Sequence, residues 1–260
     1  MPSMTRLRAA CARRRSMLSA ATAVAGCTIL AACTVQRPDE RAVAPELTLK
    51  TAHITEGTTR WRLTVQKDTA TRELGVMTST TQYSEYMGRP AILFVRTVPT
   101  PTGSIVDSVL MLRHTLAPVW EHSHQPTKTM LLSFADSAVT GEWAPTDSAM
   151  RSVHHPIPRP VFNATAQGLL ISSLPLAEGY QTLIPIYSFE LEGMELDTLS
   201  VVGTGRVRMR TGGEREAWKL AFADPFITAT FWVDRETRRV LLQDIVSRKT
   251  GVIFRQEPVL

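Results

Sequence analysis

The chain has 260 residues, 43% of them hydrophobic and 20% charged, and it carries a formal net charge of +5 at pH 7. Five arginines and no acidic residue fall within residues 1–32, so the rest of the chain is balanced, with 24 basic and 24 acidic side chains. With equal numbers of basic and acidic side chains, this part of the chain has no excess of positive charge that would indicate a nucleic-acid partner. It holds a single cysteine, so no disulfide can form within it.

The N-terminal segment has the pattern of a secretory leader. Arginines between Arg6 and Arg15 precede an apolar, small-residue stretch over residues 17–32. A basic segment followed by a short apolar segment is typical of a signal peptide. The stretch is marginal for a membrane-spanning helix, which needs about 20 apolar residues. We therefore predict that residues 1–32 are a leader rather than part of a folded domain.

A lipidation motif ends this leader. The sequence Leu-Ala-Ala-Cys at residues 30–33 resembles the lipobox of bacterial lipoproteins, in which the cysteine is acylated and the chain is cut just before it. We predict acylation of Cys33. The alternatives are cleavage at a weaker copy of the motif that ends at Cys27, an uncleaved anchor, and an ordinary signal peptide. Thr34 stands where enterobacterial inner-membrane lipoproteins tend to carry Asp, and this resemblance favours the outer membrane, with the protein facing the periplasm.

The rest of the chain is expected to hold a polar, proline-bearing tether over residues 33–45 and a single β-rich domain over residues 46–260. Strand patterns recur along the domain at the spacing of an all-β protein. They cover residues 47–54, the alternating segment 60–66, the Thr- and Ser-rich segment 76–83, the apolar segment 91–95, and segments 104–112, 130–134 and 138–143. The continuous apolar segment is expected to be buried on both faces of the sheet.

One short helix is predicted between the two halves of the domain. Prolines interrupt regular structure over residues 156–160, after which Asn163 is a suitable N-cap for a helix over residues 164–173 that Pro175 ends. Gly168 weakens this helix. The predicted fold is mainly β (α+β), with one curved antiparallel sheet or half-barrel and the short helix packed in or over it.

The segment 174–246 carries the most specific strand pattern. Large apolar side chains occupy alternate positions over residues 218–222, and residues 226–233 are rich in β-branched and aromatic residues. The polar stretch 234–238, which opens with Asp, precedes a second apolar run at residues 240–242. We predict a hairpin here.

A set of residues between positions 104 and 246 carries a family resemblance. The set is Thr115-Leu116-x-Pro118, Pro160-Val161-Phe162, the sequence LPLAEGY at residues 174–180, Trp218, and WVDxETRR at residues 232–239. Its order is similar to a family of exported bacterial proteins known only as a domain of unknown function. That family looks related to the LolA/LolB-like lipoprotein carriers, so the resemblance implies a curved half-barrel closed by helices around an apolar cavity. It implies no catalytic residue.

Several large apolar side chains have two interpretations. They can line a lipid cavity, because ligand sites are mostly apolar and concave, or they can form a filled core, which is favoured for any single one of them. They are Trp61, Tyr180, Ile184, Trp218, Phe222, Phe231 and Val233.

The histidines do not form a recognisable metal motif. His122 and His124 share one face of a strand, and His154 and His155 follow, but a zinc site needs further ligands at defined spacing. We interpret the two pairs as a polar edge strand and a proline-rich loop, and we expect neither a metal nor a cofactor.

A glycine pair and a basic run remain in the second half. Gly203 and Gly205 lack the third glycine of a nucleotide-binding loop, because Arg208 stands in its place, and they are predicted to form a turn. Arg206, Arg208 and Arg210 lie on one face of a strand. That face is expected to be solvated, with contact to anionic lipid headgroups or lipopolysaccharide as the alternative.

Three functions are compatible with these patterns. The leading hypothesis is a non-enzymatic envelope lipoprotein that binds a lipid, an acyl chain or another apolar ligand, or that supports envelope assembly. The second is a structural or scaffolding lipoprotein with a solid core that acts through protein contacts. The third is an envelope hydrolase that uses histidines clustered with a carboxylate.

Overall fold

The computed structural model of this chain describes residues 47–210 and 212–259. The predicted leader over residues 1–32, the predicted acylation of Cys33 and the predicted tether over residues 33–45 lie outside the described residues.

The described residues form one sheet of fifteen strands in the order β8-β7-β6-β5-β4-β3-β2-β1-β15-β14-β13-β12-β11-β10-β9. The first eight strands are β1 (Gly57–Lys67), β2 (Ala70–Tyr86), β3 (Arg89–Thr100), β4 (Gly103–Leu112), β5 (Pro118–Gln125), β6 (Lys128–Phe134), β7 (Ala138–Pro145) and β8 (Arg151–Pro156). The others are β9 (Phe162–Asn163), β10 (Gln181–Ser188), β11 (Gly193–Arg208), β12 (Glu214–Ala223), β13 (Ile227–Asp234), β14 (Val240–Ser247) and β15 (Ile253–Val259).

The predicted mainly β fold with one antiparallel sheet is confirmed. Every described pairing is antiparallel except that of β9 with β10. The sheet is not closed, because its outermost strands β8 and β9 do not pair with each other. β1 pairs with both β2 and β15, so the first and last described strands meet in the middle of the sheet.

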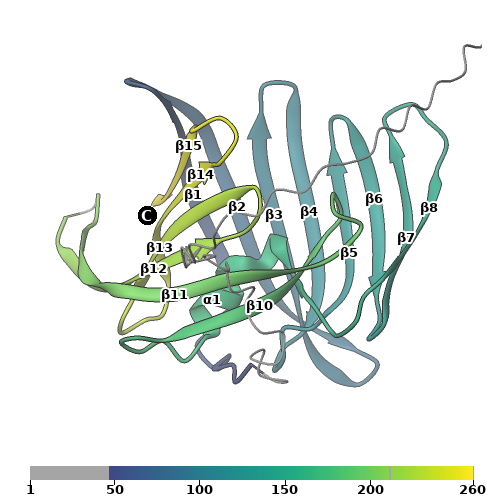
Figure 1. The fold of residues 1–260 in the computed structure, drawn as a ribbon, viewed down its shortest axis with the longest axis horizontal. Coiled ribbons are helices and arrows are strands. Elements are labelled where there is room, and N and C mark those ends of the chain that lie inside the picture. The colour runs from purple at the N-terminus through teal and green to yellow at the C-terminus, as the bar shows by residue number, and fades with distance from the viewer. Residues whose placement is uncertain (1–46, 211, 260) are drawn as a thin grey trace, which may run out of the picture. The chain divides into compact units, whose positions relative to one another are not determined.

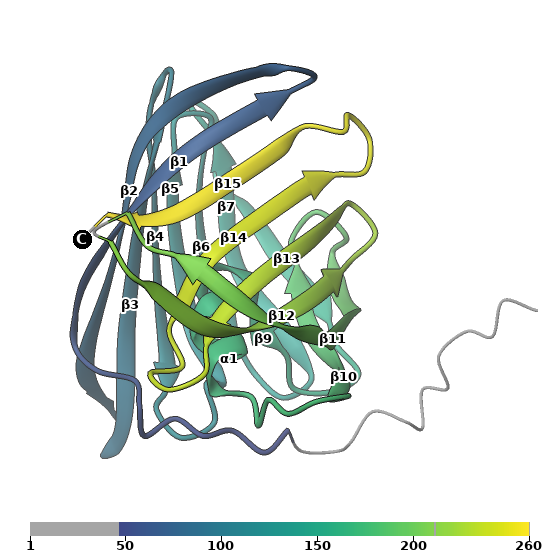
Figure 2. The same ribbon diagram turned by 90° about the vertical axis from the view of Figure 1, so that its left-hand side faces the viewer.

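A short helical segment lies within the curve of this sheet (Figures 1 and 2). It consists of a 3-10 turn, η2 (Ala164–Ala166), followed by α1 (Gln167–Ser173). Its apolar side chains Leu170 and Ile171 belong to one buried cluster with Ile92 and Val109 of the first half of the sheet. From the second half, the same cluster includes Ile184, Ile186, Leu199, Val201, Leu220, Phe222, Ala229, Phe231 and Val233. The two halves of the sheet therefore share a core around the helix.

The predicted start and end of the helix are confirmed. The side chain of Asn163 accepts a hydrogen bond from the backbone N–H of Thr165 at 2.8 Å, which caps the first turn. The helix ends at Ser173, with Leu174 in extended conformation before Pro175. The guanidinium of Arg238, in the turn between β13 and β14, donates a hydrogen bond to the carbonyl oxygen of Leu174 at 2.8 Å. The helix end is thus tied to the C-terminal hairpin.

That hairpin forms where the sequence predicts it. β13 and β14 pair through a turn in which the Asp234 carboxylate accepts hydrogen bonds from the backbone N–H groups of Glu236 and Thr237, at 2.8 and 2.7 Å. Other expectations were wrong. Residues 47–54 form no strand, and the apolar run 91–95 is fully buried only at Ala91, Ile92 and Phe94. Leu93 and Val95 are half-buried instead.

A second cluster joins the outer strands of the two halves. It contains Met130, Leu132, Val139 and Val153 of β6–β8, and Tyr187 of β10 inserts among them. The Tyr187 ring lies edge-on to Phe134 with ring centroids 5.5 Å apart, and its hydroxyl lies 2.8 Å from Nδ1 of His155. Together with the helix, this contact makes the two halves of the sheet face each other. Within the described residues, no helix has the length and apolar character needed to cross a membrane.

The close pairing of β6 and β7 depends on one glycine. Gly141 has a φ of +153°, and a Cβ atom there would meet the backbone carbonyl of Leu131. Gly141→Ala is therefore expected to lower the free energy of unfolding by about 2–4 kcal/mol, measured by urea denaturation. Gly168→Ala, in a helical position with open space around it, is the matched control and is expected to raise stability by about 0.5–1 kcal/mol. Equal effects at both positions would contradict this account of the packing of β6 against β7.

Candidate functional site

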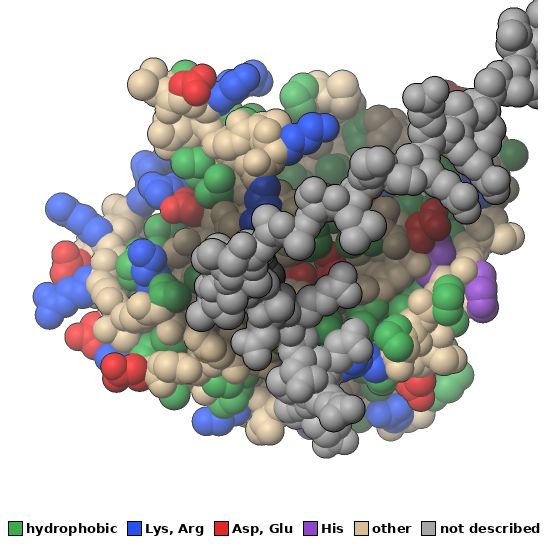
Figure 3. Space-filling model, viewed as in Figure 1, with side chains coloured by type: hydrophobic (Ala, Val, Ile, Leu, Met, Phe, Trp, Pro, Cys, Tyr) green, Lys and Arg blue, Asp and Glu red, His purple; other side chains and the backbone are tan. Residues whose placement is uncertain are grey.

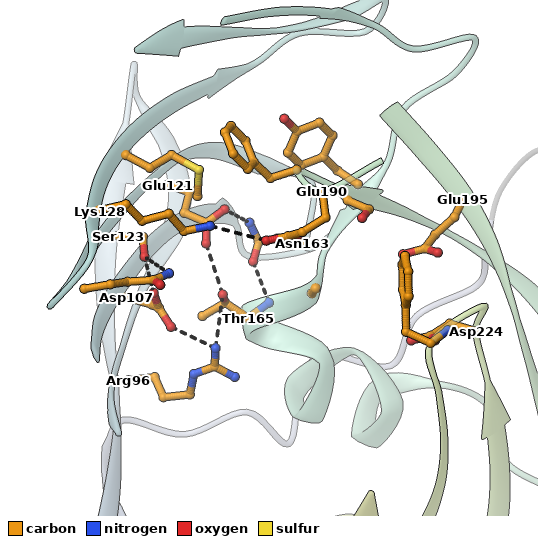
Figure 4. A pocket seen from close by; sticks show the side chains of 17 residues that line it. Arg96, Asp107, Glu121, Ser123, Lys128, Asn163, Thr165, Glu190, Glu195 and Asp224 are labelled. Carbon is orange, nitrogen blue, oxygen red and sulfur yellow. Dashed lines mark hydrogen bonds and ion pairs between the residues drawn. The ribbon is translucent and has the colours of Figure 1, made fainter. Parts of the chain in front are cut away.

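A pocket of about 420 Å³ lies between the two halves of the sheet. Its lining is polar and apolar in similar measure and comes from β3–β6, the start of the helical segment, and the β10–β13 region. The lining residues are Arg96, Asp107, Glu121, Ser123, Gln125, Lys128, Met130, Asn163, Ala164, Thr165, Tyr187, Ser188, Phe189, Glu190, Glu195, Asp224 and Phe226. Figure 4 shows the pocket with Arg96 and Asp107 on one wall and Glu195 and Asp224 on the facing wall.

The first wall begins with an ion pair across neighbouring strands. Asp107 of β4 stands opposite Arg96 of β3 and Ser123 of β5, so the three side chains share one face of the sheet. The Asp107 carboxylate accepts a hydrogen bond from the Ser123 hydroxyl at 2.6 Å and one from Nη2 of Arg96 at 2.8 Å. Gln125 donates to the Ser123 hydroxyl at 3.1 Å. The buried Asp107 carboxylate is therefore fully partnered.

A buried glutamate connects this wall to the helix. One carboxylate oxygen of Glu121 accepts a hydrogen bond from Nδ2 of Asn163 at 2.8 Å, and the other accepts one from the Thr165 hydroxyl at 3.1 Å. Burial raises the pKa of Glu121 above its usual range, and these two hydrogen bonds oppose the increase. The residue that caps the helix is thus the residue that holds Glu121 in the pocket.

The facing wall is acidic. Glu195 comes from β11 and Asp224 from the turn before β13. Oδ1 of Asp224 accepts hydrogen bonds from the backbone N–H groups of Phe226 and Ile227. At the rim, the ammonium of Lys128 lies 3.3 Å from the Glu190 carboxylate. Of the five carboxylates that line the pocket, two are therefore in ion pairs, and among the described residues Glu195 and Asp224 have no cationic partner.

Two buried acceptor atoms beside this wall have no hydrogen-bond donor within the described part of the chain. They are Oε2 of Glu195 and Oδ1 of Asp197, whose residue is only 2% exposed. Burial, followed by repulsion from neighbouring carboxylates, raises the pKa of Glu195 to about 7 and that of Asp197 to about 8. The wall is thus suited to a group that donates hydrogen bonds or carries positive charge.

The pocket also has an apolar side formed by Met130, Phe189 and Phe226. The Phe226 side chain is 50% exposed at the mouth, and the Lys128 ammonium lies 5.0 Å from the centre of the Phe189 ring. No group of three or more His, Cys, Asp or Glu side chains arranged to hold a metal ion occurs within residues 47–210 and 212–259. The arrangement can bind an organic molecule that has both a donor-bearing end and an apolar part.

The seven apolar residues singled out from the sequence lie outside this lining. Ile184, Phe222, Phe231 and Val233 belong to the core around the helix, and Tyr180 and Trp218 pack against it. Phe222 and Phe231 contact edge-to-face, with ring centroids 6.1 Å apart. The last of the set, Trp61, is half-buried on β1 opposite Met77. The structure thus brings six of the seven into or against one core cluster, which also includes Leu170 and Ile171 of the helix.

The histidines occupy strands that differ from the predicted ones. His122 and His124 are exposed on β5, which is an interior strand and not an edge strand. His154 and His155 lie on β8, the edge strand, and not in a loop. No histidine lines the pocket, and His155 reaches its border only through the Tyr187 hydroxyl. The prediction failed because the alternation in this region is carried mainly by polar side chains.

The predicted turn at Gly203–Gly205 was also wrong. Both glycines lie within β11, next to a β-bulge between Val201 and Gly203. Glycine inside a strand often marks a bulge or a close approach of another group. Here the indole of Trp232 occupies the space beside Gly205, where a Cβ atom would lie 2.9 Å from it.

Sequence reasoning missed the pocket residues, although a signal for them exists. Asp107 has the same strand parity as the core residues Val109 and Met111, and Glu195 and Asp197 have the parity of Leu199. Polar side chains that continue a buried face are unusual, because they need partners away from water. That pattern is the one sequence feature that points to the pocket.

The raised pKa of Asp197 predicts a pH-dependent stability. The folded protein binds more protons than the unfolded chain between the ordinary aspartate pKa of about 4 and the folded pKa of about 8, so stability falls as the pH rises through that window. Asp197→Asn is expected to be more stable than the wild type at pH 8, by about 1–3 kcal/mol, and to lose this advantage near pH 4. Urea denaturation at several pH values measures the difference, with the exposed Asp68→Asn as control. A constant difference at all pH values would contradict the assignment.

Comparison with known proteins assigns the chain to a family. A comparison with curated proteins finds no match. A family model described as "Protein of unknown function (DUF3108)" matches residues 51–258, which include every described strand except the last residue of β15. The match covers most of the chain, so this protein belongs to the DUF3108 family.

Proposed function

We propose that this protein is a non-enzymatic lipoprotein of the cell envelope that binds an amphiphilic ligand in the pocket between the two halves of its sheet. The observation that carries the proposal is the unequal pairing of the two pocket walls. On the first wall, Asp107 and Glu121 are held by internal donors. On the facing wall, Oε2 of Glu195 is a buried acceptor without a donor in the described residues; Oδ1 of Asp197 is another, although Asp197 does not line the pocket.

A ligand group that donates hydrogen bonds, such as an ammonium group, can pair with the acceptors of the facing wall that lack a donor. Leaving a buried acceptor without a partner costs about 1–3 kcal/mol, and a bound donor recovers that free energy. The two basic side chains of the lining, Arg96 and Lys128, form ion pairs with Asp107 and Glu190, although Nε of Arg96 is a buried donor without a partner among the described residues. The carboxylates of the lining without a cationic partner or a side-chain donor are Glu195 and Asp224, so the unpaired charges are negative. An ammonium group is therefore favoured over a carboxylate or phosphate.

The apolar side of the pocket accommodates the rest of the ligand. Phe189, Phe226 and Met130 offer aromatic and thioether surface next to the acidic wall. The volume of about 420 Å³ falls within the range of about 300–1,000 Å³ for small-molecule sites. In this proposal the protein acts as a LolA/LolB-like carrier, anchored by lipidated Cys33 to the outer membrane on the periplasmic side. Its ligand is an amine-bearing lipid or another acyl-chain compound.

The filled core favours a second candidate function. Phe222 and Phe231 are almost completely buried in the core cluster that the sheet and the helix share, which suits a rigid scaffold that acts through protein contacts. The two functions differ in one observable, because a scaffold has no need of an occupied pocket.

The first test uses matched amphiphiles. The chain with Cys33→Ser, exported to the periplasm and purified, is incubated with dodecylamine or with dodecanoate, and bound mass is measured by native mass spectrometry beside extraction of co-purified lipids. Dodecylamine is expected to bind and dodecanoate is not. The double change Glu195→Gln and Asp224→Asn is expected to weaken dodecylamine binding roughly tenfold or more, because it removes both unpaired charges.

The matched control is Glu85→Gln with Asp68→Asn, which changes the net charge equally at exposed positions outside the pocket. It is expected to leave dodecylamine binding unchanged. A wild-type protein that binds neither probe and carries no extractable lipid would eliminate the binding function and favour the scaffold. Equal losses in the pocket variant and the control would remove the assignment to this pocket.

The amine preference carries its own pH dependence. Burial raises the pKa of Glu195 to about 7, so this side chain is protonated at pH 6 and ionised at pH 8. Its ionised form attracts an ammonium group, and dodecylamine binding is therefore expected to tighten as the pH rises through about 7. Titrations of the wild type and of Glu195→Gln at several pH values measure this. A variant that keeps the full pH dependence would show that other groups cause it.

A further inference from the structure

A row of apolar side chains crosses four neighbouring strands, β1 to β4, beside the pocket. Its members, one from each strand, are Trp61, Met77, Val98 and Ile105. Trp61 stands opposite Met77, and Val98 stands opposite Ile105. Met77 and Val98 are neighbours as well, because the residues next to them, at positions 78 and 97, pair with each other. We call this row the apolar strip.

The strip lies on the face of the sheet that carries the core and the pocket. Ile105 has the same strand parity as Asp107 of the first pocket wall and Val109 of the core. Val98 stands opposite Ile105 and therefore shares its face. The strip is thus the next row of inward-facing side chains after the row that holds the ion pair of the first wall.

One end of the strip adjoins the pocket. Because Val106 pairs with His124, the next residues, Ile105 and Gln125, lie beside each other on the inner face. Gln125 stands opposite Lys128, and both line the pocket. Figure 3 views this face and shows acidic side chains in its recessed middle, with hydrophobic side chains beside them. An apolar path therefore leads from the polar pocket across the sheet to β1.

The members of the strip are apolar without belonging to the described cores. None of them is among the residues of the two core clusters, and Trp61, Val98 and Ile105 are only half-buried. The outward-facing neighbours of Trp61 are Arg60 and Arg62, so the apolar character of β1 here is confined to the inner face. Half-buried apolar side chains in a continuous row gain free energy from contact with an apolar ligand.

We propose that the apolar strip binds the alkyl chain of the ligand whose amine enters the pocket, an inference that rests on the function proposed above. Neighbouring strands are about 4.8 Å apart, so the three steps from Ile105 to Trp61 span about 14 Å, comparable to an extended dodecyl chain. The apolar side chains of the pocket contact the first carbons of that chain, and the strip contacts the rest. The ligand class is therefore a long-chain amine, and short amines bind weakly.

The first test compares alkylamines of increasing length on the exported Cys33→Ser chain by isothermal titration calorimetry. Butylamine, octylamine and dodecylamine share the amine and differ only in the chain. Each methylene that the strip covers is expected to tighten binding by up to about fourfold. Equal affinities for butylamine and dodecylamine would overturn the strip and leave the amine site standing, whereas binding of no alkylamine would eliminate both proposals.

Matched substitutions on the two faces of the same strands locate the chain. Val98→Asn with Ile105→Asn is expected to weaken dodecylamine binding about tenfold or more and to leave butylamine binding unchanged. Val95→Asn with Val106→Asn is the control, because both residues are half-buried on the outer face of β3 and β4. It is expected to bind both amines as the wild type does. Equal losses of dodecylamine binding in the two variants would overturn the proposal.

A second readout needs no polar substitution in the sheet. Dodecylamine with bromine on its terminal carbon is expected to quench Trp61 at the far end of the strip, and Trp61→Phe is expected to remove most of this quenching. Butylamine with a terminal bromine is too short to reach Trp61, so the same substitution is expected to leave its quenching unchanged. If Trp61→Phe leaves the quenching by the long amine intact, the chain runs elsewhere and the proposal is overturned.

Discussion

The hydrogen bonds between Asn163, Glu121 and Thr165 are the contact on which the rest of the structure depends. A sheet of fifteen strands that is not closed must bury one face over its whole length, and this chain does so by curving around a single short helix. Asn163 starts that helix by capping Thr165 and, with its other side-chain atom, donates to Glu121 of β5. At the other end, Arg238 holds the carbonyl oxygen of Leu174. The helix is thereby fixed to both halves of the sheet, and their separation sets the width of the pocket.

The pocket exists because the apolar core stops before the sheet does. On β4, the inward-facing side chain two residues before Val109 is Asp107, and on β11 the one two residues before Leu199 is Asp197. Burying carboxylates is unfavourable unless they are paired, and the two walls meet this cost differently. On the first wall, neighbouring side chains donate hydrogen bonds to the carboxylates. On the second wall, burial raises the pKa values of Glu195 and Asp197, so these carboxyl groups keep their protons to a higher pH. A structure under selection for stability alone would place apolar residues there, so the unpartnered wall indicates a function.

Local features could be read from the sequence, and the relation between distant strands could not. Asn163 predicts the helix start and Asp234 the hairpin turn, because each acts on backbone groups two or three residues away. The pairing of β1 with β15 joins residues almost 200 positions apart, and no local pattern encodes it. The pocket could not be predicted for the same reason, because only the pairing of distant strands brings Glu121 and Glu195 to one cavity. The histidines of β5, which stand out in the sequence, lie on its exposed face, whereas the intervening Glu121 and Ser123 face the pocket. The link to the LolA/LolB-like carriers stays a prediction.

The balanced composition beyond residue 32 conceals an acidic inner surface. Equal numbers of acidic and basic side chains suggest a neutral molecule, but five carboxylates and only two basic side chains line the pocket. On β12 and β13 the inner and outer faces alternate at every residue: Leu220 and Phe231 face the core, and Lys219 and Trp232 face outward. Because neighbouring side chains point to opposite faces, a substitution on the outer face leaves the core face of the same strand intact. The two faces can therefore change independently of each other, although both are built on the same strands.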